Sequence, residues 1–133
     1  MIVTDTNVIG YLFLSSDKSR LSELALRKDS EWAAPVLWRS ELRNVLASYM
    51  HKAIIALHEA QQIMDRALAL MRGREFEVSS GEILKLVSES KCSAYDCEFI
   101  AVARDLGVPL VTVDKQLLRE FPDSAISLGA YCS

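Results

Sequence analysis

Two short apolar runs, far apart in the chain, constrain its fold more than any other feature. Met1–Thr4 and Leu110–Val113 are rich in β-branched residues, lack polar alternation, and are each followed directly by an aspartate. Runs of this kind are typical of strands that are buried on both faces of a parallel sheet. We therefore expect both runs to be strands of a sheet covered by helices.

Most of the sequence between these runs has helical periodicity. Helices are predicted for Ser16–Lys28, Leu37–His51, Ile54–Arg72, Gly81–Ser90 and Ala94–Leu106, and further strands for Glu31–Pro35, Glu75–Val78 and Ala125–Leu128. Strands that alternate with helices predict an α/β fold, here a three-layer α/β/α sandwich around a central, mainly parallel sheet. Two successive helices form an αα-hairpin within this alternation. The apolar stripe of the second one is expected in the core and consists of Leu57, Ala60, Met64, Leu68 and Met71.

Length and composition indicate one globular domain over residues 1–133. Half of the residues are hydrophobic (50%) and 25% are charged, as is usual for soluble proteins. No window approaches the roughly 18 apolar residues of a membrane-spanning helix, and the first residues lack the basic stretch of a signal peptide. The 3 cysteines are too few for a disulfide framework. We therefore expect no membrane partner and a reducing, cytoplasmic location.

The net charge of −3 gives no general indication of nucleic-acid binding, for which a basic balance is typical. A nucleic-acid partner has to be inferred from a specific site. The acidic residues at the predicted strand ends are the first candidates for such a site.

Asp5 and Asp114 each follow a predicted buried strand. Ligands of open α/β sheets bind outside the carboxyl ends of the strands, which is where both carboxylates are expected. A purely structural role is also consistent with the position, because an aspartate between a strand and a helix commonly caps the helix. The position of either aspartate alone does not distinguish ligand binding from helix capping.

Glu41 and Asp96 lie on predicted helices. Glu41 stands on an apolar stripe, with Leu37 and Val45 one turn away on either side. A buried carboxylate needs a partner, so Glu41 either reaches the edge of the stripe or meets a cationic group. Asp96 completes a Ser-x-x-acid capping pattern that begins at Ser93, and it also shares a helix face with inward-pointing apolar residues.

Taken together, these 4 carboxylates predict a metal site. A parallel sheet with its crossover helices would let all of them converge at one end, where they would repel one another and raise at least one pKa. A hard divalent cation such as Mg²⁺ or Mn²⁺ prefers oxygen ligands and resolves this repulsion. One or two such ions suit the hydrolysis of a phosphodiester.

With these residues in place, the chain resembles the PIN-domain nucleases, specifically the VapC-like toxins of bacterial and archaeal toxin–antitoxin pairs. The resemblance covers nearly the whole chain. It rests on Ile2-Val3-Thr4-Asp5-Thr6-Asn7, on the segment Trp38–Leu46, on Ser93-Ala94-Tyr95-Asp96, on Ala101-Val102-Ala103-Arg104 and on Leu110-Val111-Thr112-Val113-Asp114. The chain departs from the family after Asp114, where it lacks the aromatic residue that many relatives carry.

The resemblance implies a compact α/β/α domain and a Mg²⁺- or Mn²⁺-dependent endoribonuclease. By motif, the acidic metal-binding and catalytic positions are Asp5, Glu41, Asp96 and Asp114, and the polar residues beside them are Thr6, Asn7 and Thr112. The resemblance also implies a homodimer and an antitoxin partner, which could inhibit by placing a basic side chain among the carboxylates.

Basic residues beside the acids are candidates for holding the RNA backbone. They are Lys115, next to Asp114, and Arg39 or Arg43, next to Glu41; each could equally be an ordinary solvated surface charge. If metal neutralises the 4 carboxylates, the net charge moves from −3 to +1, which favours phosphate locally.

Three other functions remain open at this point. The chain could be a PIN-type RNA-processing nuclease without an antitoxin, or a PIN-like binding module without catalysis. It could also be a phosphatase-type or receiver-type domain with Asp5 as phosphate acceptor, although Asp5-Thr6-Asn7 lacks the second acid of an Asp-x-Asp motif.

Overall fold

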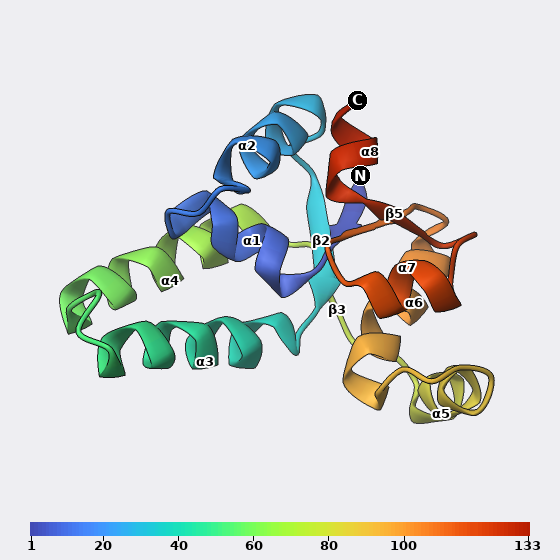
Figure 1. The fold of residues 1–133 in the computed structure, drawn as a ribbon. Coiled ribbons are helices and arrows are strands. Elements are labelled where there is room, and N and C mark those ends of the chain that lie inside the picture. Colours follow the sequence, from blue (N-terminus) through green and yellow to red (C-terminus); the bar gives the residue numbers. More distant parts are fainter.

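A central sheet of 5 parallel strands organises the molecule, in the order β3-β2-β1-β4-β5 (Figure 1). The computed structural model describes residues 1–133. The strands are β1 (Ile2–Thr4), β2 (Trp32–Pro35), β3 (Glu75–Phe76), β4 (Leu110–Thr112) and β5 (Ala125–Ser127). β1 and β4, the two runs that lack polar alternation, are adjacent and completely buried.

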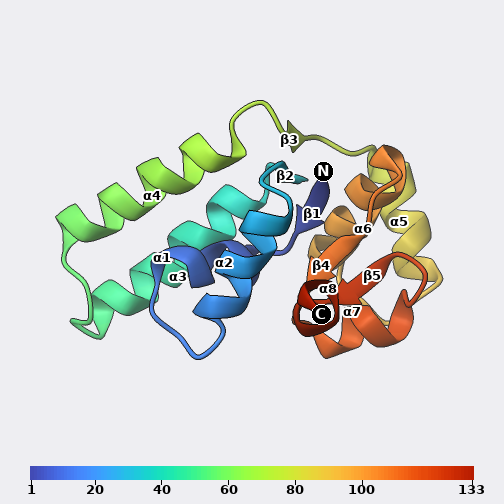
Figure 2. The ribbon, with the colours of Figure 1, turned by 90° about the horizontal axis from the view of Figure 1, so that it is seen from above.

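Helices cover both faces of this sheet, which confirms the predicted α/β/α sandwich. They are α1 (Thr6–Phe13), α2 (Ser19–Lys28), α3 (Trp38–His51), α4 (Leu57–Met71), α5 (Ser80–Ser88), α6 (Ala94–Leu106), α7 (Lys115–Glu120) and α8 (Leu128–Cys132). Figure 2 shows α1 to α4 on one side of the strands and α5 and α6 on the other. The αα-hairpin of α3 and α4 projects away from the sheet.

The predicted boundaries shift where local hydrogen bonds start or stop an element. The helix expected from Ile54 begins only at Leu57, because Ala53 has a positive φ of 58° and the Glu59 carboxylate accepts from the Ala56 amide at 3.0 Å. The strand expected to reach Leu128 ends at Ser127, whose hydroxyl caps α8. α6 has the predicted bounds, and Gly107 ends it in the left-handed conformation with φ 66°.

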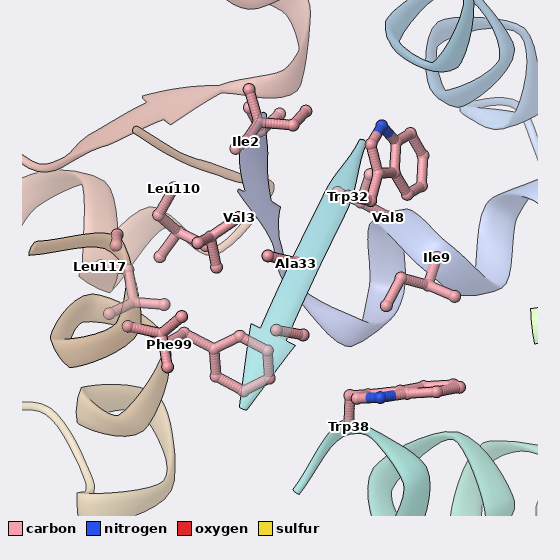
Figure 3. Packing of buried hydrophobic residues seen from close by; sticks show 14 of the residues in the cluster. Ile2, Val3, Val8, Ile9, Trp32, Ala33, Trp38, Phe99, Leu110 and Leu117 are labelled. Carbon is pink, nitrogen blue, oxygen red and sulfur yellow. The ribbon is translucent and has the colours of Figure 1, made fainter. Parts of the chain in front are cut away.

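The core lies on both faces of β1 and β2 (Figure 3). Phe99 and Leu117 pack on one side of these strands, while Ile9 and Trp38 pack on the other. The expected core stripe of α4 is only partly right: Ala60 and Met71 are buried, but Leu57 is 59% exposed because it begins α4 at the tip of the hairpin. None of the helices combines the length and apolar character needed to span a bilayer.

Candidate active site

One pocket of about 250 Å³ contains all of the acidic residues predicted to form the site. It lies at the carboxyl ends of β1 and β4, where α1 and α7 begin, and α3 and α6 complete it. Its polar lining consists of Asp5, Thr6, Asn7, Glu41, Asn44, Asp96 and Asp114. The fold thus brings together residues that are more than 100 positions apart in the chain.

Asp5 is the most deeply buried of these acids, with 7% of its surface exposed. One carboxylate oxygen, Oδ1, accepts a hydrogen bond from the Val8 amide at 2.9 Å and so caps α1. The other, Oδ2, accepts from the Thr112 hydroxyl and from the Val113 amide at 3.1 Å. Burial raises the pKa of Asp5 above its usual value; these hydrogen bonds oppose the rise, and the charge of Asp114 adds to it.

Thr112 connects two of the carboxylates. Its hydroxyl donates to Asp5 and accepts from the Asp114 amide at 3.0 Å. Asp114 Oδ1 in turn accepts from the Leu117 amide at 2.9 Å and caps α7. Both aspartates at strand ends therefore cap a helix, and both also line the pocket.

Glu41 is held by a hydroxyl group. Thr6 Oγ1 donates to Glu41 Oε1 at 2.7 Å, and no basic side chain forms an ion pair with this carboxylate. Burial raises the pKa of Glu41, the Thr6 hydrogen bond opposes the rise, and the charges of Asp96, Asp5 and Glu98 add to it. The cationic partner considered from the sequence is absent.

Asp96 occupies the first turn of α6. The hydroxyl of Ser93, the N-cap, accepts from the Asp96 amide at 3.1 Å, as the capping pattern predicts. The Asp96 side chain nevertheless lines the pocket, and burial together with the charge of Asp114 raises its pKa.

No basic side chain lines this acidic pocket. Arg39 is turned away from it and forms a bidentate ion pair with Glu75, with N–O distances of 2.5 and 2.6 Å. Arg43 donates to the Ser40 hydroxyl, and Lys115 lines a separate pocket beside Lys18. The structure therefore does not bring the three candidate RNA-backbone residues into the acidic pocket.

The donor set fits a hard divalent cation. It offers carboxylate, hydroxyl and amide oxygens, and binding of a cation would relieve the repulsion that contributes to the raised pKa values of Asp5, Glu41 and Asp96. The side chains surround the pocket without forming a ready-made group of three ligands for one ion. This spacing is compatible with Mg²⁺, which keeps several waters and is commonly held by one or two carboxylates.

Two residues near the acids were not predicted from the sequence. Asn44 lines the pocket one helical turn after Glu41, and its i+3 spacing on α3 is the signal that could have identified it. Glu98 is half-buried close enough to raise the pKa of Glu41. Of the predicted polar neighbours, Thr6 and Thr112 contact carboxylates directly, and Asn7 is an exposed part of the pocket wall.

Comparison with known proteins identifies the family. Residues 2–122 match the PIN domain. The chain belongs to the PIN domain family. It is 25% identical over 125 residues to Ribonuclease VapC3 of Pyrobaculum aerophilum, an alignment that covers 91% of this chain and 95% of that protein.

Solved structures share the fold of this PIN domain at low sequence identity. FitAcB from Neisseria gonorrhoeae superimposes with a TM-score of 0.76 at 17% identity, covering 97% of this chain and 99% of that chain. A toxin–antitoxin complex from Klebsiella pneumoniae gives 0.73 at 19% identity, covering 96% and 98%. The three-layer architecture is therefore shared with both of these solved structures.

Proposed function

We propose that this PIN domain is a metal-dependent endoribonuclease that hydrolyses RNA phosphodiesters, and that it is the toxin of a VapBC-type toxin–antitoxin pair. The observation that carries the proposal is the pocket lined by Asp5, Glu41, Asp96 and Asp114 without a single basic side chain. The similarity to a protein named Ribonuclease VapC3, and to the structure of a toxin–antitoxin complex, supports the same assignment.

Asp5, Glu41, Asp96 and Asp114 would hold Mg²⁺ or Mn²⁺, directly or through water molecules. A bound ion supplies Lewis acidity: it lowers the pKa of a water molecule and neutralises charge on the phosphodiester oxygens. Thr112 and Thr6 fix the orientations of the Asp5 and Glu41 carboxylates through their hydrogen bonds. Asp114 uses Oδ1 to cap α7, which leaves Oδ2 available to accept a hydrogen bond from the attacking water.

The phosphate-acceptor alternative for Asp5 is disfavoured by its surroundings. The residue is buried, and both of its carboxylate oxygens already accept hydrogen bonds. The hydrogen bonds from Val8, Thr112 and Val113 delocalise the carboxylate charge and weaken Asp5 as a nucleophile. A metal ion needs only the lone pair that remains on Oδ1.

The partners belong to the same proposal. Residues 1–133 would act as a single nuclease domain in the cytoplasm, as a homodimer, until an antitoxin inserts a basic side chain into the acidic pocket. Arg43 and Lys115 remain candidates for contacts with RNA phosphates outside the pocket. Arg39 is the weaker candidate, because Glu75 occupies its guanidinium group.

Cleavage of a pool of structured RNAs by the purified protein tests the activity. Reactions contain Mg²⁺, Mn²⁺ or EDTA, and the variants Asp5→Asn and Asp96→Asn are compared with Asp65→Asn, which removes the same charge from an exposed position on α4. We expect cleavage that needs the metal, is lost in the first two variants and persists in the third. Cleavage that survives in Asp5→Asn and Asp96→Asn, or that is insensitive to EDTA, would contradict the assignment.

A further inference from the structure

A second, smaller pocket of about 70 Å³ adjoins the acidic one between α1 and α3. Thr6, Asn7 and Val45 line both, so the two pockets share a wall. Beyond this wall the second pocket is lined by Tyr11 and Tyr49, and we call it the aromatic pocket. Nothing in the proposed chemistry uses it.

Helical spacing explains why the aromatic pocket continues the acidic one. On α3, Glu41, Val45 and Tyr49 follow one another at intervals of four residues and so share a face. Glu41 to Tyr49 covers roughly 12 Å of helix axis at 1.5 Å per residue. On α1, Asn7 and Tyr11 are also four residues apart and lie on the facing side. The groove therefore runs from the carboxylates to the two aromatic rings.

The two tyrosines are not ordinary core residues. Both side chains are half-buried. Neither phenol oxygen is among the buried polar atoms that lack a hydrogen-bond partner. Burial raises the pKa of Tyr11, and the charges of Asp5, Asp17 and Tyr49 add to the rise, so the ring lies within electrostatic range of both the acidic pocket and the second tyrosine. The aromatic pocket thus combines two rings with hydroxyl groups that are open to a ligand.

Gly10 gives an independent reason to regard this space as functional. It lies in the interior of α1, lines the aromatic pocket, and does not have the positive φ that Gly73 and Gly107 show. A Cβ atom at this position would meet only Leu42 Cδ1, at 3.9 Å, an ordinary van der Waals distance. Glycine destabilises a helix interior relative to alanine, and neither the backbone nor the packing requires it here. Its effect is to leave the pocket open.

We infer that the aromatic pocket binds a nucleobase of a single-stranded RNA whose phosphodiester lies among the carboxylates of the neighbouring pocket. This inference rests on the proposed function and adds a base-binding pocket beside the acidic one, with a positioning role for Tyr11 and Tyr49. Unpaired bases stack on aromatic side chains in proteins that bind single strands, and amide groups read their edges. The exposed Asn7 side chain on the shared wall supplies such an amide.

Binding of two probes isolates the contribution of the base. One is a fluorescein-labelled single-stranded RNA of random sequence, and the other is a strand of equal length and charge that carries abasic residues. Fluorescence anisotropy is measured with Mg²⁺ in the Asp96→Asn background, so that the strands are not cut. Stacking of one base predicts that the RNA binds roughly 5–100-fold more tightly than the abasic strand.

Tyr49→Leu should reduce this ratio several-fold while binding of the abasic strand stays unchanged, because leucine keeps apolar bulk but has no aromatic face, and only Tyr11 remains to stack on the base. Tyr131→Leu is the matched control: Tyr131 is half-buried on α8, lines neither pocket, and should leave the ratio intact. Gly10→Ala narrows the pocket without removing any contact, and we expect a smaller ratio with no loss of thermal stability.

Several outcomes would overturn the inference. The first is a ratio of RNA affinity to abasic-strand affinity near one when the pocket is unsubstituted. The second is a ratio that neither Tyr49→Leu nor Gly10→Ala changes. The third is that these two variants lose the binding of a partner polypeptide but bind RNA as before. Cleavage by the wild-type protein is scored separately. If it cleaves RNA but the ratio does not depend on Tyr49, the base pocket is wrong and the nuclease stands. If the ratio depends on Tyr49 without any cleavage, the nuclease is wrong and the pocket stands.

Discussion

Two glutamates, Glu41 on α3 and Glu75 beside it on β3, have opposite electrostatic surroundings. Glu75, on β3, accepts hydrogen bonds from the Arg39 guanidinium and from the Trp38 indole nitrogen at 2.9 Å, and these contacts lower its pKa. Glu41, only two residues after Arg39, accepts from a Thr6 hydroxyl and faces other acids, and its pKa is raised. One carboxylate anchors α3 to the sheet, while the other opposes folding when it is charged.

The difference shows what each region contributes. At Glu75 the sequence supplies a cation and a buried donor, so the charged form is stabilised in the folded protein. In the acidic pocket it supplies hydroxyl and amide donors but no cation, although basic residues are available nearby on the same helix. The proposed cation would supply the missing positive charge from outside the chain, which is the basis of the predictions below.

Removal of the Glu75 carboxylate, which is paired with Arg39, should have the largest effect on stability. Glu75→Ala leaves the indole N–H of the fully buried Trp38 without its acceptor, and we expect the free energy of unfolding to fall by about 1–3 kcal/mol. Urea denaturation measures the change. Glu77→Ala, at an exposed position two residues later, is the control and should change it by less than about 0.5 kcal/mol. Equal effects of the two substitutions would show that Glu75 is not an anchor.

Addition of a divalent cation should stabilise the protein through the acidic pocket. A ligand that binds only the folded state adds about 2.7 kcal/mol at a concentration of one hundred times its Kd. We therefore expect Mg²⁺ or Mn²⁺ to raise the thermal unfolding temperature of the wild-type protein and to have a much smaller effect on Asp5→Asn and Asp96→Asn. A rise of the same size in all three proteins would mean that the ion binds elsewhere.

The sequence predicted the sheet better than the short helices around it. β1 and β4 were recognisable because buried parallel strands lack polar alternation, and α6 because a serine cap and a glycine stop define its ends. No bounds were predicted for α1, because it has only 8 residues and Gly10 interrupts its helical signal. α7 and α8, with 6 and 5 residues, are too short to show a periodicity.

The acids of the candidate site could be found from their positions at strand and helix ends, but their partners could not. Arg39 was a candidate for RNA binding, whereas the structure pairs it with Glu75, because β3 lies beside β2 in the sheet. That contact spans 36 residues, and no local pattern encodes it. The Thr112 bridge to Asp5 spans 107 residues and was available only through the family resemblance.

The pH dependence of stability should separate the two regions. Asp5, Glu41 and Asp96 have raised pKa values, so without metal their favourable contribution is complete below the usual values of 3.8 and 4.5 and is lost as the pH rises through the folded-state pKa values. Glu75 has a lowered pKa and contributes above 4.5, with loss as the pH falls through its folded-state value.

Unfolding in EDTA should therefore show maximal stability at mildly acidic pH and a decline toward neutral pH. Mg²⁺ should abolish the decline toward neutral pH, since it stabilises the ionised carboxylates. The measurement is a series of urea transitions across this range with and without the ion. Stability in EDTA that rises steadily from pH 4 to pH 7 would contradict the opposition between the two regions.

Substitution of the unpartnered glutamate should have the smallest effect, with a sign opposite to that at Glu75. Glu41→Gln retains an acceptor for the Thr6 hydroxyl but removes the repulsion from Asp96 and Asp5, so we expect a gain of a few tenths to about 1 kcal/mol in EDTA. The gain should vanish in saturating Mg²⁺, where only the wild-type protein keeps the full carboxylate set. Glu23→Gln, at an exposed position of α2, is the control for loss of charge alone. A Glu41→Gln protein that is less stable than the wild type in EDTA would mean that its carboxylate already has a favourable partner, and the acidic pocket would then need no external cation.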